Sequence, residues 1–182
     1  MSRFGGRLRG SLPVSRWLGG GGSGPSLVQR DTITIAAGAT SNTATLAIPV
    51  DPNRSRLVFC GVSAPAADLA ESAACRVTFT NSNTITGAVN TTGSGNRIIS
   101  FEVLTYPAGV IRSIQRDTSA TGTKAISAVG DRATIDYLGH TTTSASPGTG
   151  EALASVRISS TIQVTIAGAG SNTVGFQVTD WF

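Results

Sequence analysis

The sequence predicts an all-β protein made of two tandem β-sandwiches that follow a flexible N-terminal arm. Three observations carry this prediction: apolar and polar residues alternate in short runs, turn residues separate these runs, and a set of short phrases occurs twice in the same order. Of the 182 residues, 40% are hydrophobic and 13% are charged. This apolar content is too high for a disordered chain, and the length suits two small domains.

Apolar residues two positions apart recur along the chain, as at Ile33/Ile35, Leu46/Ile48, Leu57/Phe59, Val77/Phe79, Ile135/Tyr137, Val164/Ile166 and Val174/Phe176. A period of two indicates a strand that is buried on one face. Thr fills many of the alternate positions, which suits the pleated outer face of a sheet. Helix signals are weak, and the alanine-rich stretch 64–74 is the one place where we expect a short helix between two strands.

Clusters of Gly, Asn, Asp, Pro and Ser separate the runs about every 8 to 12 residues, which is typical of a sandwich or a barrel. We therefore expect two immunoglobulin-like modules of about six strands each, one in residues 26–107 and one in residues 108–182. The linker at Tyr106–Gly109 is short, so the two modules should lie close together.

The tripeptide Gln-Arg-Asp occurs twice, at residues 29–31 and 115–117, each time after an aliphatic residue and before Thr. The strand-like blocks that follow also repeat in order and type, while the spacers between them are shorter in the second copy. A period this long indicates a duplicated domain rather than a solenoid. The duplication predicts two matched core pairs, Phe59 with Tyr137 and Phe101 with Phe176.

Residues 1–25 differ from the rest, because they are rich in Gly and carry four Arg and no acidic residue. Ordering Gly costs the most backbone entropy, so this segment should not fold alone. It lacks the continuous apolar core of a secretory signal, and no stretch of the chain approaches a membrane span. Two roles remain open, a disposable tail and a docking arm that orders on a partner. The second is favoured by apolar anchors among flexible cationic residues, and the candidate docking residues are Arg3, Phe4, Arg7, Arg9, Trp17 and Leu18.

The net charge of +4 belongs to the arm. Up to Arg30 there are five basic residues and no acidic one, whereas the remainder has nine basic and ten acidic residues. The modules are therefore nearly neutral and lack a basic patch with interleaved aromatics, which argues against a nucleic-acid partner. An acidic groove on a protein suits the arm at least as well as DNA does.

Signatures of catalysis are scarce. His140 is the only histidine, so a histidine-based triad or a zinc site would depend on it entirely. We expect it to be a surface residue at the end of a strand, and we expect no catalytic, cofactor or metal residues. The nucleophile-elbow, metalloprotease and phosphate-loop patterns are all missing from the sequence.

Cys60 and Cys75 leave two alternatives open. Each lies at the end of an expected strand, so they could face one another, but Cys60 is out of phase with Leu57 and Phe59. A disulfide between them would need a bulge at the strand end. The favoured alternative is two unbridged and mostly buried thiols. The second copy has Leu138 in place of Cys60, so the fold should not depend on a bridge.

The stretches VQRDTITIAAGATSNTATLAIPV, CRVTFTNSNTITGAV and ISFEVLTYP resemble a group of small β-rich structural proteins of tailed bacteriophages. Asp31 and Asp117 stand where that group has Gly in its opening phrase. The resemblance covers most of residues 26–106 and, more faintly, residues 110–182. It implies a non-enzymatic virion protein, often present in several copies as a homo-oligomer, that is made in the host cytoplasm without a signal peptide.

The resemblance implies contacts with other virion proteins, and the arm would anchor the chain as a tail or baseplate component of the fibre type, with host-surface contact. The alternative is a capsid decoration or head-fibre protein. A third hypothesis, a carbohydrate-binding module, needs a cluster of exposed aromatics, but most aromatic residues fall on core positions. Neither membrane insertion nor a nucleic-acid partner is expected.

Overall fold

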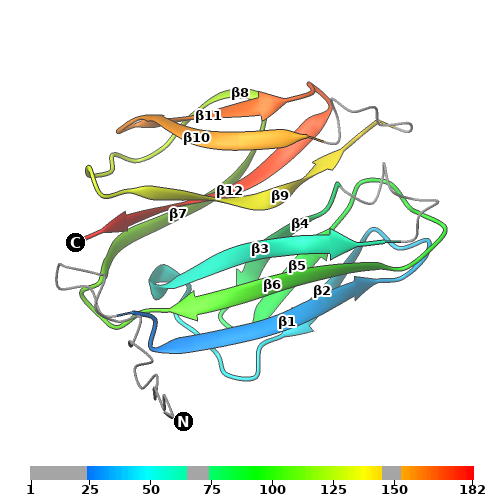
Figure 1. The fold of residues 1–182 in the computed structure, drawn as a ribbon, viewed down its shortest axis with the longest axis horizontal. Helices are drawn as coiled ribbons and strands as arrows, with labels where there is room; N and C mark the ends of the chain where they lie inside the picture. The colour runs from blue at the N-terminus through cyan, green and yellow to red at the C-terminus, as the bar shows by residue number, and fades with distance from the viewer. Residues whose placement is uncertain (1–23, 65–73, 145–152) are drawn as a thin grey trace, which may run out of the picture.

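The computed structural model describes residues 24–64, 74–144 and 153–182, and its regular structure is β throughout apart from one 3-10 turn (Figure 1). The all-β class is thus confirmed. The elements in chain order are β1 (Leu27–Ile35), β2 (Ser41–Thr45), η2 (Pro52–Arg54), β3 (Ser55–Ser63), β4 (Arg76–Asn81), β5 (Thr84–Ala88), β6 (Arg97–Thr105), β7 (Ile111–Ala120), β8 (Gly122–Ala125), β9 (Thr134–Thr142), β10 (Ala154–Ser160), β11 (Gln163–Gly168) and β12 (Asn172–Trp181).

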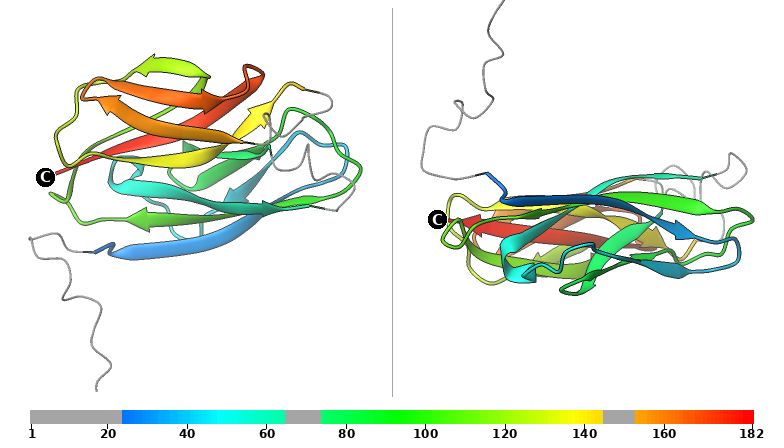
Figure 2. Two further views of the ribbon diagram at one scale, coloured as in Figure 1. Left: turned by 45° about the horizontal axis from the view of Figure 1, so that its top comes forward. Right: turned by 90° about the horizontal axis from the view of Figure 1, so that it is seen from below.

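The strands form one sheet of six and two sheets of three. The six-stranded sheet has the order β2-β5-β4-β9-β12-β7 and therefore runs through both halves of the chain. The three-stranded sheets, β1-β6-β3 and β10-β11-β8, lie over its two ends. Each half is thus a two-layered sandwich, and the two sandwiches lie side by side (Figures 1 and 2).

The halves meet at a single bridge in the long sheet. β4 and β9 are antiparallel and pair at Arg76 and Gly139, and the His140 N–H donates to the Cys75 carbonyl at 3.1 Å. Gly139 has a φ of 87°, and a Cβ there would collide with the Cys75 carbonyl. Glycine is therefore required at this position, because the strand of the other half approaches its backbone closely.

Both halves have the same strand order and register. β1-β6-β3 corresponds to β7-β12-β9, and β2-β5-β4 corresponds to β8-β11-β10. Phe59 faces Phe101 on β3 and β6, and Tyr137 faces Phe176 on β9 and β12. Phe59 thus corresponds to Tyr137 and Phe101 to Phe176, as the sequence predicted. The third strand of each half has a bulge directly after its aromatic residue, so even the irregularities correspond.

The repeated tripeptide has the same structural role in each half. The Gln29 side chain donates to the carbonyl of Ile48 at 2.8 Å and accepts from its N–H at 2.9 Å. Gln115 makes the same two bonds with Ser127, at 2.9 and 2.7 Å. In both copies the Asp side chain then accepts from the backbone N–H of the following Thr. In each half the Gln side chain thus takes the place of a backbone partner just beyond the end of the second strand, which is β2 in the first half and β8 in the second.

That departure explains one difference from the predicted strands. The alternation Leu46/Ile48 indicates a strand, but β2 ends at Thr45. Beyond it, the Leu46 N–H still donates to the Asn83 carbonyl at the turn before β5, whereas Ile48 bonds to the side chain of Gln29 and so leaves the ladder. Ile48 consequently exposes 51% of its surface. The short helix expected in 64–74 falls almost wholly outside the described residues.

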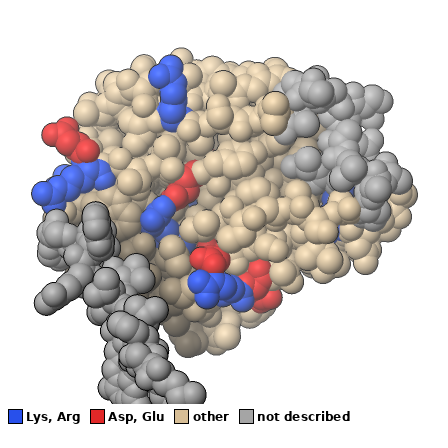
Figure 3. Space-filling view, viewed as in Figure 1, with Lys and Arg blue, Asp and Glu red and all other residues tan. Residues whose placement is uncertain are grey.

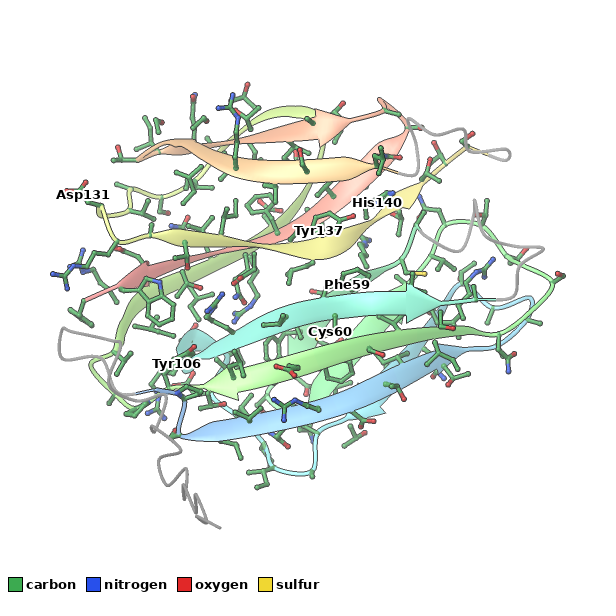
Figure 4. All side chains as sticks on the ribbon, viewed as in Figure 1. Phe59, Cys60, Tyr106, Asp131, Tyr137 and His140 are labelled. Carbon is green, nitrogen blue, oxygen red and sulfur yellow. The ribbon has the colours of Figure 1, made fainter. Side chains whose placement is uncertain are left out.

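Each sandwich has its own apolar core, and one residue crosses between them. The first core contains Ile33, Ile35, Leu57, Val77, Ile85, Ile99, Phe101 and Val103, and the second contains Val164, Ile166, Val174, Phe176 and Val178. Leu138, from the bulge of β9, belongs to the first core although it lies in the second half. The rings of Phe59 and Tyr137 also meet edge to face across the boundary, with centroids 6.0 Å apart (Figure 4).

Candidate interaction surfaces

The six docking residues predicted in the arm, Arg3, Phe4, Arg7, Arg9, Trp17 and Leu18, lie outside the described residues. The described body has two surfaces that bear on function. One is the boundary between the halves, and the other is the solvent-facing side of the β1-β6-β3 sheet.

A polar network holds the boundary together. The Arg56 guanidinium binds both oxygens of Asp136, with its Nε 3.0 Å from Oδ2. The buried amide of Gln177 donates to Asp136 at 2.9 Å, and its oxygen accepts from Arg116 Nε at 2.8 Å and from the Leu57 N–H at 3.2 Å. Gln177 has no exposed surface, so its amide depends on these three partners for hydrogen bonding.

Arg116, from the second Gln-Arg-Asp, reaches across into the first half. It donates to the carbonyls of Pro52 and Ser55, and its guanidinium lies 4.7 Å above the ring of Phe79. Burial lowers the pKa of this guanidinium to about 10, and the charge of Asp136 acts in the opposite direction. Arg116 therefore stays charged at neutral pH and attracts both the carbonyl oxygens and the aromatic face.

Aromatic side chains close one end of the boundary. Tyr106 meets Trp181 edge to face at 5.1 Å, and Arg56 lies 5.4 Å from the centre of the Trp181 ring. The indole N–H of Trp181 donates to Thr134 at 3.0 Å. Together with the shared sheet, these contacts join the two sandwiches into one body.

The outer face is the name used here for the solvent-facing side chains of the β1-β6-β3 sheet, namely Val28, Arg30, Thr32, Val58, Cys60, Ile98, Ser100, Glu102 and Leu104. Val28 exposes 39% and Ile98 exposes 41% of its surface, so apolar area meets solvent here. On the side of the molecule shown in Figure 3, the described charged side chains form a few small groups, and neutral residues cover most of the remaining described surface. A face of this kind suits contact with another protein.

The one prominent charge pair of the outer face is Arg30 with Glu102. Their hydrogen bond raises the pKa of the Arg30 guanidinium. The Arg30 side chain is largely exposed, so the pair adds little to stability. Arg30 and Glu102 face each other on β1 and β6. Arg116 and Gln177 face each other at the corresponding positions of β7 and β12 in the second half. A shallow hollow of about 340 Å³ lies beside it, lined by residues that include Arg30, Cys60 and Ser100.

His140 is not the surface residue that the sequence suggested. It lies within β9, exposes 2% of its surface, and contacts the Tyr137 hydroxyl through Nδ1 (Figure 4). The expectation was wrong because β9 continues past the bulge at Leu138 and Gly139, so that His140 pairs with Val174 of β12 within the sheet. In residues 24–64, 74–144 and 153–182, no three His, Cys, Asp or Glu side chains gather into a metal site, and no helix could cross a membrane.

The two cysteines differ in their surroundings. Both lie in the described part of the chain and neither is bridged; Cys75 is buried, as its phase with Val77 indicates, whereas Cys60 is exposed on the bulge of β3. The expectation that both thiols are buried is thus wrong for Cys60. Burial raises the pKa of the Cys75 thiol to about 11, and neighbouring Arg97 opposes this. Burial also raises the pKa of Cys60, and Glu102 adds to the effect.

We expect reduction to leave the melting temperature unchanged and an alkylating reagent at neutral pH to modify Cys60 long before Cys75. The thiolate is the reactive species, and Cys75 is both shielded and protonated. Mass mapping of the modified cysteines, with and without denaturant, measures the difference. A fall of many degrees on reduction would instead reveal a disulfide, since a bridge closing a loop of about 15 residues contributes about 3 kcal/mol.

No protein-family model matches the chain, and no curated protein or solved structure matches it either. The sequence analysis missed the boundary residues, although a comparison of the two copies carried the signal. Gln177 stands where the first half has Glu102, and Asp136 stands where it has Val58. The second half thus has an amide where the first has an acid, and an acid where the first has an apolar residue. Both differences lie on the face that is buried against the other half.

Proposed function

We propose that the chain is a non-enzymatic structural protein of a bacteriophage virion, anchored by residues 1–25 as a tail or baseplate component of the fibre type. The observation that carries this proposal is the union of two sandwiches into one body by a shared sheet, a shared core residue and a buried polar network. Such a body keeps its shape while it displays one sheet face, which suits a particle component. The resemblance of 26–106 to phage structural proteins supports the same assignment.

We infer that the two halves arose by duplication of one immunoglobulin-like sandwich. The order β2-β5-β4 matches strands B, E and D of the immunoglobulin fold, and the neighbours β6-β3 match F and C. The first strand lies beside β6, in the place that strand G has in that fold. Gln29 and Gln115 each make the same pair of hydrogen bonds to one backbone residue. This supports descent from one ancestor, because the same side chain is used at the same position of the sheet.

Deletion of residues 1–25 is expected to leave the melting temperature of the body unchanged and to abolish incorporation into particles. The arm carries apolar anchors that a Gly-rich peptide cannot bury against itself, and a large aromatic in a partner's pocket contributes about 2 kcal/mol or more. Trp17→Ala should therefore lose most of the incorporation. Quantitative mass spectrometry of purified particles, made with the variant in place of the wild-type chain, measures this.

Phe182→Ala is the matched control, because Phe182 is an aromatic on the body that exposes 58% of its surface. It should enter particles as the wild type does. Full occupancy by the truncated chain would show that the arm is a passive tail, and absence of the wild-type chain from particles would refute the virion assignment. Localisation to capsid vertices or faces by electron microscopy would replace the tail location with a capsid one.

A further inference from the structure

A hollow of about 510 Å³ lies at the end of the second sandwich where β12 finishes, beside the turn that contains Asp131 (Figure 4). Three segments that are far apart in the sequence form its walls, and each contributes a charged or aromatic side chain. The side chains are Arg112 from the start of β7, Asp131 and Arg132 from the turn before β9, and Trp181 and Phe182 from the end of β12 and just beyond it. Two guanidinium groups, a carboxylate and aromatic rings thus meet in one place.

The corresponding end of the first sandwich has a neutral pair at this position. The register of the two halves makes Thr105 the counterpart of Asp180, and the Thr105 hydroxyl lies 2.8 Å from the hydroxyl of Ser55. In the second half, the carboxylate of Asp180 exposes 3% of its surface and lies 3.3 Å from the guanidinium of Arg112. The shared fold therefore does not require a charge here, and the buried ion pair is a feature of the second half.

Both arginines are held in place and keep donors for a ligand. Arg112 donates to Asp180 through Nη1, and its guanidinium lies 5.3 Å from the centre of the Phe182 ring. Arg132 donates through Nη1 to the carbonyl oxygen of Phe182 at 2.9 Å. Among the described residues these are the only hydrogen-bond acceptors of the two groups, and a guanidinium has five N–H donors. Two guanidinium groups at one hollow thus have donors left over.

Gly130 makes room for this arrangement. Its N–H donates to Oδ1 of Asp180 at 3.2 Å, so the turn and the buried carboxylate are joined. A Cβ at Gly130 would lie 2.9 Å from Nη1 of Arg112 and 3.2 Å from the same carboxylate oxygen. Any other residue would therefore push the Arg112 guanidinium away from the position that Asp180 gives it.

The side chains of the hollow select the chemistry of a ligand. A guanidinium group binds a carboxylate through two parallel hydrogen bonds. Phe182 exposes 58% of its surface, so an aromatic ring lies in solvent beside the two guanidinium groups. The exposed carboxylate of Asp131 accepts from hydroxyl groups and repels a bare anion with several charges. A sugar ring with a carboxylate has the acid, the apolar ring face and the hydroxyl groups that these side chains require.

We propose that this hollow binds an acidic sugar, which is a pyranose ring that carries a carboxylate group. Arg112 and Arg132 bind the carboxylate, the apolar face of the ring packs against Phe182, and Asp131 accepts from the hydroxyl groups. In a virion component such a site would supply the contact with the host surface. The binding itself does not depend on the virion assignment, because every group that it uses belongs to this chain.

The indole N–H signal of Trp181 in two-dimensional NMR spectra reports on the hollow. The chain has two Trp residues, so a Trp17→Phe variant identifies the signal of Trp181. At constant ionic strength, methyl glucuronide should shift this signal and saturate with a dissociation constant of about 1 to 10 mM, as expected for a ligand of this size. Methyl glucoside is the same ring without the acid, and acetate is the acid without the ring. Each should bind about tenfold more weakly or worse.

Arg132→Gln removes one guanidinium group and should weaken the binding of methyl glucuronide about tenfold. Its melting temperature should stay that of the wild type, because Arg132 is exposed. Phe182→Ala should also weaken the binding, although it enters particles as the wild type does, which separates this site from attachment to the particle. Arg157→Gln is the matched control, since Arg157 is an exposed arginine on β10 outside the hollow, and it should bind like the wild type.

A wild type that shows no saturable shift with methyl glucuronide up to about 100 mM overturns the proposal. So does acetate or methyl glucoside that binds as tightly as methyl glucuronide, because one part of the ligand would then suffice. Unchanged affinity in an Arg132→Gln chain that melts like the wild type overturns it as well. Equal losses in Arg132→Gln and Arg157→Gln would show a general attraction of charge instead of a site. All of these measurements use the purified chain, so their outcome is independent of whether the chain enters particles.

Discussion

Gly139→Ala is expected to lower the free energy of unfolding by about 3 kcal/mol or more. The new Cβ would collide with the Cys75 carbonyl and lie 2.8 Å from the Arg76 Cα, and both are backbone atoms that cannot turn aside. β4 and β9 would have to separate where the two halves share their sheet. Thermal unfolding followed by circular dichroism should show a fall of roughly 10 °C, given the size of the chain.

Gly61→Ala is the control within the same molecule. It has the same place in the bulge and also a positive φ, but its Cβ would meet open space. The cost should be limited to backbone strain of about 1 to 2 kcal/mol. Equal losses at the two positions would contradict the view that Gly139 is required by the close approach of β4.

Asp136→Ala is expected to cost about 3 kcal/mol, because it removes the only carboxylate of the boundary network described above. Arg56 would lose both of its ionic hydrogen bonds, and the buried amide of Gln177 would lose its acceptor. The guanidinium of Arg116 would also lose a neighbouring negative charge. Urea unfolding, with the midpoint and slope fitted together, measures the loss.

Glu102→Ala tests the same rung of the first half. Its pair with Arg30 is exposed, so we expect a loss below about 1 kcal/mol. Asp136→Asn keeps the shape and one acceptor oxygen but removes the charge. A loss as large as that of Asp136→Ala would identify the charge as the source of stability. If Asp136→Ala cost no more than Glu102→Ala, the network would contribute no more than an ordinary surface pair.

The sequence predicted the β class and most of the strands, because a period of two directly reflects the side of a sheet on which a residue lies. It also predicted the matched aromatic pairs, since the repeated blocks preserve register. It failed at Ile48, where side-chain bonds from a distant Gln end the strand, and at His140, where a bulge changes the phase. Neither event leaves a local mark in the pattern of apolar residues.

The boundary could not be predicted from either copy alone. Arg30 and Arg116 are identical in sequence context, yet one lies in solvent and the other reaches the carbonyl of Pro52. What distinguishes them is the neighbouring half, which a periodic pattern does not encode. The difference between Glu102 and Gln177 was visible, but it acquires meaning only when the two strands are known to be counterparts.

The position of Leu138 has a consequence for how the molecule comes apart. Because this residue fills the core of the first half while its own strand belongs to the second, neither half can open its interior without disturbing the other. Opening of either half should therefore disrupt the bridge at Gly139, and we expect the two sandwiches to unfold as one cooperative unit. Backbone amides on β6 and β12, the central strands of the two halves, should exchange their hydrogens at one common slow rate.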